Sequence, residues 1–342
     1  MARRAHVEPP TATRPTSDRP IIQTVSGPVD AEGIGPTLIH EHLIIDLTVY
    51  WRPEDAPEAA GLAVDLDTLS SVREHAFAVR HNLALDRIDQ AVDGLSRFRE
   101  AGGGLVVEVT SLGIGRDVRA VEMISRRSDV PVVVGCGHYV GASRPRGFEH
   151  RSVADLTDEL VVELTQGIDG TGIRAGVIGE IGVGQFPMLD HERRMLRAAA
   201  QAQVATGAGM IVHPAPGTDS SFELVKVLAS AGAIMEKVVV SHLDERFRGD
   251  LRLFRRLEAT GARFGFDTFG REIFFEPRQR QHPSDAQRIE VVVKLWDAGM
   301  GERIAVAQDI CLRHELPAWG GQGYHHVLTS IVPRMRLAGI TT

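Results

Sequence analysis

Thr37-Leu-Ile-His-Glu-His-Leu43 is a short apolar run that ends in a His-x-His pair, and beyond Leu47 the chain becomes polar and irregular. Side chains two residues apart in a strand point to the same face, so the His40 and His42 imidazoles are expected to face one way. The run therefore predicts a strand whose C-terminal end carries two rings able to share one metal ion. Taken alone, the pair is equally compatible with a surface coincidence or with two core histidines.

The rest of the chain alternates between apolar runs and segments of helical spacing. We expect a short strand over 21–29, a helix near 66–80 in a long polar connection, and further strands over 105–109, 130–135, 174–181, 210–213, 238–242, 263–266 and 304–307. Helices are expected over 87–101, 116–127, 153–166, 187–206, 222–231, 250–260, 283–298 and 324–337. This rhythm predicts an α/β protein with about eight strand–helix units, a (β/α)₈ TIM barrel.

The strands lack polar alternation, which is typical of a parallel sheet buried on both faces. A doubly wound open sheet is the alternative, but the sequence shows no Gly-rich phosphate loop after the first strand. Residues 21–342 are interpreted as one barrel domain, because no change in composition divides them. Residues 1–20 are rich in Pro, Thr, Arg and Asp and are interpreted as a flexible N-terminal tail.

Composition excludes several classes of function. Hydrophobic residues make up 43% of the chain, and the formal charge of −7 without a basic stripe argues against nucleic acid as a partner. No apolar run approaches the roughly 20 residues of a membrane helix, and the N-terminus lacks the apolar core of a secretory signal. Two cysteines form no disulfide framework. We therefore expect a cytoplasmic protein that acts on a small molecule.

Polar residues end five of the expected strands, where a barrel of this kind keeps its functional side chains. They are His40, His42, Glu180, His213, His242 and Asp309. Four imidazoles and two carboxylates at one mouth suit two divalent ions, with Zn²⁺ favoured and Mn²⁺, Fe²⁺ or Co²⁺ as alternatives. Residues near the same ends are candidate substrate contacts: His138, Tyr139, Asp267, Arg271 and Arg313.

Four motifs carry a resemblance to a known family: Gly35-Pro-Thr-Leu-Ile-His-Glu-His-Leu43, Val107-Glu-Val-Thr-Ser-Leu-Gly-Ile-Gly-Arg-Asp117, Ala175-Gly-Val-Ile-Gly-Glu-Ile-Gly182, and Gln308-Asp-Ile-Cys311 followed by Gly320-Gly-Gln-Gly-Tyr324. From about residue 21 onward the chain resembles the phosphotriesterase family of the amidohydrolase superfamily. The resemblance implies an amidohydrolase-like barrel with a binuclear, usually zinc, centre. It assigns His40, His42 and Asp309 to the more buried ion and His213 and His242 to the more exposed one.

The resemblance also identifies a branch. Organophosphate hydrolases and related lactonases bridge their ions with a carboxylated lysine, whereas this chain has Glu180 at that position. Glu180 is similar to the bridging residue of the phosphotriesterase homology and phosphotriesterase-related proteins, which include resiniferatoxin-binding relatives. For this branch, hydrolysis of N-acyl amino-sulfonate amides is one implied activity, and a homodimer is compatible with it.

The expected mechanism is hydrolysis by a bridging hydroxide that attacks an ester, lactone or amide carbonyl. Asp309 is the expected catalytic residue, which accepts the proton of the hydroxide and delivers it to the leaving group. Two alternatives stay open. One is a phosphoester or phosphotriester hydrolase, and the other is a barrel that binds a small ligand without turnover.

Overall fold

A ring of eight parallel strands forms the centre of the molecule. The computed structural model describes residues 19–275 and 280–341. In chain order the strands are β3 (Thr37–Glu41), β6 (Leu105–Glu108), β7 (Val132–Cys136), β8 (Val177–Gly182), β9 (Gly209–His213), β10 (Val238–Val240), β11 (Arg263–Phe266) and β14 (Ile304–Val306). The first and last strands approach each other where the Asp309 amide donates to the His40 carbonyl at 3.1 Å. The predicted (β/α)₈ barrel is confirmed.

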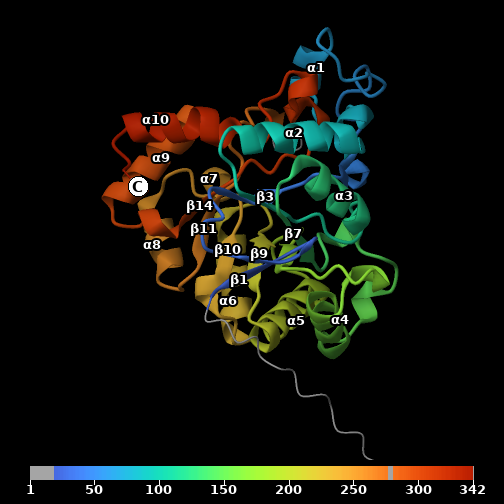
Figure 1. Ribbon diagram of the computed structural model, residues 1–342, viewed down its shortest axis with the longest axis vertical. Helices are drawn as coiled ribbons and strands as arrows, with labels where there is room; N and C mark the ends of the chain where they lie inside the picture. The colour runs from blue at the N-terminus through green and yellow to red at the C-terminus, as the bar shows by residue number, and fades with distance from the viewer. Residues whose placement is uncertain (1–18, 276–279, 342) are drawn as a thin grey trace, which may run out of the picture.

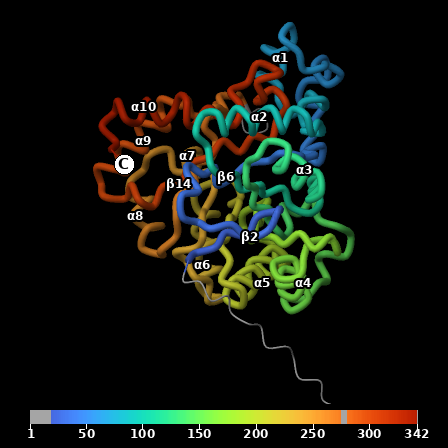
Figure 2. The backbone as a smooth tube through the Cα atoms, in the orientation of Figure 1, coloured from blue at the N-terminus to red at the C-terminus, as the bar shows by residue number. Residues whose placement is uncertain are grey.

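Helices surround this ring (Figures 1 and 2). They are α2 (Ile88–Glu100), α3 (Val118–Ser128), α4 (Val153–Thr165), α5 (Asp190–Thr206), α6 (Thr218–Ser230), α7 (Leu243–Arg246), α8 (Leu251–Glu258), α9 (Asp285–Asp297) and α10 (Val332–Leu337). Several begin at caps that the sequence encodes. Ser284, for example, accepts from the Gln287 amide, which satisfies an N–H that the first turn of α9 leaves unpaired.

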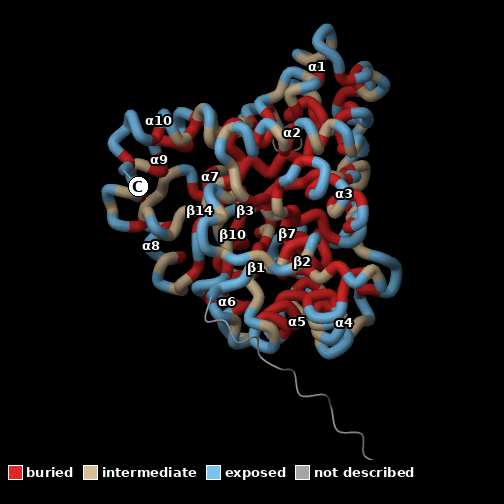
Figure 3. The backbone as a smooth tube through the Cα atoms, viewed as in Figure 1, coloured by how far each residue is buried: buried red, intermediate tan, exposed pale blue. Residues whose placement is uncertain are grey.

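The strands are buried on both faces, as their apolar composition predicts. Every residue of β7 and β8 is buried, and Figure 3 shows the buried chain concentrated in the middle of the molecule. Side chains inside the barrel form one cluster, made by Leu105, Val109, Val133, Val177 and Ile211. Polar residues at the C-terminal ends of the strands face the barrel mouth above this cluster.

The expected strand over 21–29 is wrong in one respect, because it is a hairpin. β1 (Ile21–Thr24) and β2 (Gly27–Asp30) pair antiparallel. Gly27 has a φ of +113°, a conformation that glycine tolerates and that allows the chain to turn back on itself. The Val25 amide donates to the carbonyl of Val132, the first residue of β7. The hairpin therefore lies at the end of the barrel opposite to the mouth.

Two other segments also differ from expectation. The helix expected near 66–80 is limited to α1 (Leu69–Glu74), in a connection whose apolar residues form their own small cluster. The helix expected over 324–337 starts with a π-helical turn, Val327–Ile331, before α10. Most of the expected tail, residues 1–18, lies outside the described residues. In the described part of the chain, no helix has both the length and the apolar character needed to cross a bilayer.

Candidate metal centre

All six strand-end residues meet at the barrel mouth. His40 is the next-to-last residue of β3, and His42 follows the end of that strand. Glu180 lies within β8, and His213 is the last residue of β9. His242 and Asp309 follow β10 and β14 by two and three residues. Five of the six side chains are buried, and His213 is half-buried. Six ligand-type side chains from five strands are thus brought together, although they are spread over 270 positions of sequence.

Glu180 lies at the centre of the group. Its Oε1 is 3.0 Å from Nδ1 of His213, 3.4 Å from Nε2 of His242 and 3.5 Å from Nε2 of His40. Two sets of donors fit a metal ion, and both contain this residue: one adds His40 and His42, the other His213 and His242. One carboxylate therefore joins two donor sets, an arrangement suited to a pair of ions.

The His40 ring gives a direct test of whether a cation fits. Its Nδ1 is 2.8 Å from Asp267, but its fully buried Nε2 has no hydrogen-bond partner among the described residues. A buried polar atom without a partner costs free energy, and such atoms are rare in native proteins. Since Nε2 faces Glu180 at 3.5 Å and Asp309 at 3.6 Å, a divalent ion between them would satisfy it. The donor set therefore fits a metal.

Asp309 lies beside the first donor set. Its Oδ1 is 3.1 Å from Nε2 of His42, and its Oδ2 is 2.7 Å from Nη1 of Arg271. Burial alone would raise the pKa of Asp309, but the charges of Arg271 and His40 outweigh it and lower the pKa to about 2. Asp309 is therefore held as a carboxylate at neutral pH.

Two of the six residues have left-handed backbone conformations. His242 has a φ of +60° and Asp309 a φ of +50°. For residues other than glycine this region is sparsely populated, and its cost is tolerated mainly where the surrounding structure holds the residue in place for function. Both residues lie just past strand ends, where a change of direction turns their side chains into the mouth.

The imidazoles differ in their electrostatic surroundings. Burial lowers the pKa of His213, and the opposing effect of the nearby Glu180 carboxylate does not reverse this shift. For His242 the effect of burial is outweighed by Asp267, which raises the pKa to about 10. Burial would raise the pKa of Glu180, but His40 and His213 hold it well below its usual range. The centre thus keeps its carboxylates ionised.

Buried carboxylates behind the imidazoles fix the ring orientations. Asp267 contacts Nδ1 of His40 at 2.8 Å and Nδ1 of His242 at 3.0 Å, so it aligns one ring of each donor set. Thr110 contacts Nδ1 of His42 at 2.9 Å and donates its hydroxyl hydrogen to Glu108. Partners of this kind fix the tautomer and orientation of metal-ligating histidines.

Glu41, the middle residue of the His-x-His, points away from the mouth. Its Oε1 accepts from the Gln308 amide at 2.8 Å, and its Oε2 accepts from the Ile310 amide at 3.0 Å. These amides flank Asp309. The first strand therefore supplies two candidate ligands and also holds the backbone of a third.

A cavity of about 390 Å³ opens over the centre. It is lined by His42, Glu180, His213, His242 and Asp309 together with Tyr50, Tyr139, Glu245, Arg246, Arg271 and His282, among others. Of the expected substrate contacts, Tyr139 and Arg271 line this cavity, and the Tyr139 hydroxyl is 3.4 Å from Nδ1 of His213. Arg271 is also held by Glu315 at 2.6 Å, so it positions Asp309.

The other three expected substrate contacts lie elsewhere. Asp267 is fully buried behind the rings. Nε2 of His138 is 2.6 Å from Glu159, and Arg313 binds the His81 carbonyl and Asp86. The sequence analysis missed Glu245 and Arg246 as cavity residues. Their position shortly after the strand-end residue His242 could have indicated them. His282 was missed as well, and its contribution arises only from tertiary folding.

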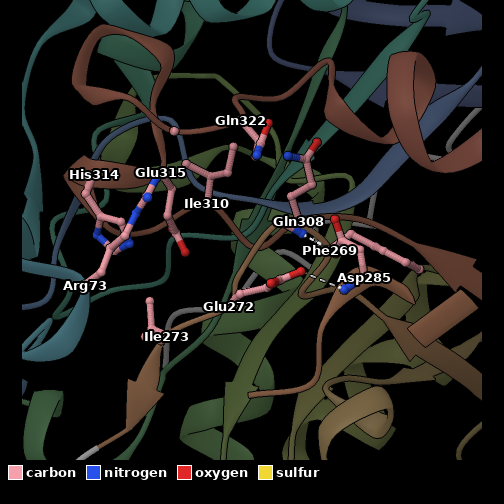
Figure 4. A pocket seen from close by; sticks show the side chains of 12 residues that line it. Arg73, Phe269, Glu272, Ile273, Asp285, Gln308, Ile310, His314, Glu315 and Gln322 are labelled. Atoms are coloured by element: carbon pink, nitrogen blue, oxygen red, sulfur yellow. Dashed lines mark hydrogen bonds between the residues drawn. The ribbon is translucent and has the colours of Figure 1, made fainter. Parts of the chain in front are cut away.

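A second cavity, of about 280 Å³, is lined by Glu315, the carboxylate that binds Arg271. Figure 4 shows His314, Glu315 and Arg73 on one side of it and Gln308, Phe269 and Asp285 on the other. Ile273 lines both cavities. None of the six candidate ligands lines the second cavity, so the chemistry of the metal-type donors belongs to the first.

The barrel and its converging donors define a class, the (β/α)₈ enzymes with a metal-type site at the mouth. Within that class the chain belongs to the phosphotriesterase family, whose model matches residues 20–342. It is 38% identical to N-acetyltaurine hydrolase from Rattus norvegicus over 328 residues, which are 94% of this chain and 93% of the relative. It is 34% identical to the phosphotriesterase-related protein of Nematostella vectensis, with 93% of each chain covered.

Solved structures agree with this assignment. A resiniferatoxin-binding protein from Rhodobacter sphaeroides matches with a TM-score of 0.90 at 35% identity, covering 94% of this chain and 90% of that one. The phosphotriesterase homology protein of Escherichia coli, complexed with phosphate in its active site, has a TM-score of 0.75 at 28% identity, covering 91% and 94%. The family resemblance predicted from the motifs is confirmed, and family and relatives identify the chain as a hydrolase.

Proposed function

We propose that this protein hydrolyses the amide bond of a small N-acylated substrate at a centre of two divalent ions, with Zn²⁺ the favoured metal. The observation that carries the proposal is the pair of donor sets joined by Glu180. The 38% identity to an N-acetyltaurine hydrolase over nearly the whole chain supports an amide as the scissile bond. Esters and lactones present the same kind of acyl carbon to the site. The imidazole and carboxylate donors also suit Mn²⁺, Fe²⁺ or Co²⁺.

Each residue of the centre has a role in this proposal. His40, His42 and Asp309 would hold the more buried ion, His213 and His242 would hold the more exposed one, and Glu180 would supply a carboxylate to both. Ions bound there would polarise the scissile carbonyl and would lower the pKa of a bridging water enough to supply hydroxide at neutral pH.

Asp309 is the proposed proton carrier. Its carboxylate is held ionised by Arg271 at 2.7 Å, and its other oxygen faces the donor nitrogens of His42 and His40. From that position it accepts a proton from the nucleophile and delivers it to the leaving nitrogen. The Tyr139 hydroxyl also lines the cavity, beside His213, where it would contact the acyl part of the substrate.

A phosphoester is the second candidate substrate. The observation in its favour is the phosphate in the active site of the Escherichia coli relative. Phosphoester hydrolysis also uses paired ions that activate water, so the same residues would serve.

A substrate panel separates these candidates. Protein loaded with Zn²⁺ is assayed against N-acetyltaurine, a γ-lactone, a phosphate monoester and paraoxon, beside elemental analysis of the protein as purified. We expect about two metal equivalents and the highest kcat/KM on the amide. The proposal is rejected if a phosphoester is turned over best, or if the metal-loaded protein binds N-acetyltaurine without cleaving it.

A further inference from the structure

Three arginines line the cavity over the metal centre, and they differ in how their charge is used. The guanidinium of Arg271 is already paired within the protein. It binds Asp309 and Glu315 and contacts the sulfur of Cys311 at 3.1 Å. Arg52 is exposed to solvent. Arg246 differs from both. It has no carboxylate at ion-pair distance closer than 3.7 Å among the described residues, and only 6% of its side-chain surface is accessible.

Arg246 keeps hydrogen-bond donors without partners. Its Nη2 donates to the Pro214 carbonyl at 3.2 Å, while its buried Nε has no hydrogen-bond partner among residues 19–275 and 280–341. A guanidinium has five N–H donors in a planar fork that matches a carboxylate or another oxyanion. Arg246 therefore lines the cavity with a guanidinium that has one hydrogen bond to the described residues, through Nη2, although Nε itself lies below the surface.

The charge of Arg246 is also incompletely balanced. The carboxylate closest to it in sequence, Glu245, is 3.7 Å from Nη1 and is shared with His282, whose Nδ1 is 2.9 Å away. A buried charge that is weakly paired is costly, and a functional ligand is one reason for a protein to keep it.

The position of Arg246 links it to the reacting groups. It is the last residue of α7, which begins directly after His242. The carbonyl that anchors its guanidinium belongs to Pro214, the residue after His213. The cation is thus fixed between the ends of the two strands that carry the more exposed donor set.

We propose that Arg246 binds the anionic group of an N-acyl amino acid or amino sulfonate substrate, and that this contact sets the preference of the enzyme for such substrates over neutral amides. This inference rests on the proposed amide hydrolysis for its choice of substrate. The binding of an oxyanion by Arg246 does not depend on that choice. It rests on the contacts of Arg246 and on its position in the cavity.

The test compares an anionic and a neutral substrate of nearly the same shape. N-acetyltaurine and N-acetylethanolamine differ in a sulfonate against a hydroxyl. Arg246→Gln should raise KM for N-acetyltaurine by about 10- to 100-fold, because a hydrogen bond to a charged group contributes about 1.5–3 kcal/mol. For N-acetylethanolamine, kcat/KM should change by less than about 3-fold. Arg252→Gln is the matched control for loss of one positive charge, since Arg252 is 91% exposed and lies outside the cavity.

A binding measurement keeps the inference testable if turnover fails. Calorimetry with propane-1-sulfonate, which has no scissile bond, should show at least about 10-fold weaker binding to Arg246→Gln than to wild type, with metal content unchanged. If Arg246→Gln does not fold, Glu245→Gln replaces it and should tighten sulfonate binding, because the competing carboxylate is gone. Arg246→Lys should retain part of the affinity.

The outcomes separate the two proposals. Sulfonate binding that depends on Arg246, without hydrolysis of any amide, overturns the proposed function and leaves the anion site standing. Amide hydrolysis with equal loss on charged and neutral substrates, or sulfonate binding that Arg246→Gln and Glu245→Gln do not change, overturns the anion site.

Discussion

The Asp309 carboxylate has an imidazole on one side and a guanidinium on the other. Replacement by Asn keeps the shape but removes the charge that accepts a proton. In Asp309→Asn we expect kcat to fall by at least about 100-fold, the range of general acid–base effects. Metal content should fall much less, because Glu180 and the four histidines remain. Steady-state kinetics with elemental analysis checks this, and loss of metal in proportion to activity would make Asp309 a structural ligand only.

Glu180 is the single residue common to both donor sets. In Glu180→Ala we expect at least one metal equivalent to be lost, because each set loses its only shared oxygen donor. Glu163→Gln is a suitable control, since Glu163 is also buried but pairs with Arg116, outside the mouth. If Glu180→Ala retains both ions, Glu180 does not bridge them.

At the scale of single residues, strand-end chemistry was the reliable signal. Convergence of the candidate ligands could be predicted because parallel strands place their C-terminal ends at one mouth. Side chains beyond the strand ends were less predictable. His138 follows β7 more closely than Tyr139 does, and Arg313 lies seven residues after β14. Their loops turn these two side chains toward Glu159 and Asp86. Loop direction depends on packing that no local pattern encodes.

At the scale of elements, β3 and the segment after β14 act as one unit because Glu41 accepts from the amides on both sides of Asp309. In Glu41→Gln, one of these amides would face an NH₂ group, and a buried donor would lose its acceptor. We expect the free energy of unfolding to decrease by about 1–3 kcal/mol.

Urea denaturation measures this loss, with Glu122→Gln as the control. Glu122 pairs with Arg126 one turn along α3 near the surface, where such pairs contribute little. If the free energy of unfolding decreases no more in Glu41→Gln than in the control, Glu41 does not stabilise the backbone around Asp309.

The elements also show where local patterns mislead. The apolar run over 21–29 reads as one strand, but Gly27 with its positive φ allows a hairpin that pairs with itself and caps the closed end of the barrel. Similarly, the polar connection 48–85 has only one short α-helix, and its apolar residues divide between a small local cluster and the main core.

At the scale of the whole molecule, His314 links stability to pH. Its Nδ1 donates to Asn82 at 3.0 Å. Burial lowers its pKa to about 4, with Glu315 opposing and Arg271 and Arg73 adding to the effect. An unfolded histidine has a pKa of about 6.5, so between these values the unfolded chain binds more protons.

The contribution of His314 to stability is therefore complete above about pH 6.5 and is lost as the pH falls toward 4. The total loss should be about 3.5 kcal/mol at most, at roughly 1.4 kcal/mol per pKa unit. Denaturant titrations of wild type and His314→Gln at several pH values measure it. The variant should lose less stability on acidification, and parallel curves for the two proteins would exclude His314 as the cause.

The sequence by itself determined the barrel, the family and the six candidate ligands. These depend on periodicity and on residue type at strand ends, which are local properties. Only the tertiary structure decided that Asp267 lies behind the rings of both donor sets, that Arg271 binds Asp309, and that the weakly paired guanidinium of Arg246 lines the cavity. Those facts depend on distances between residues from different strands and loops, and such distances are fixed by packing of the whole barrel and not by any one segment.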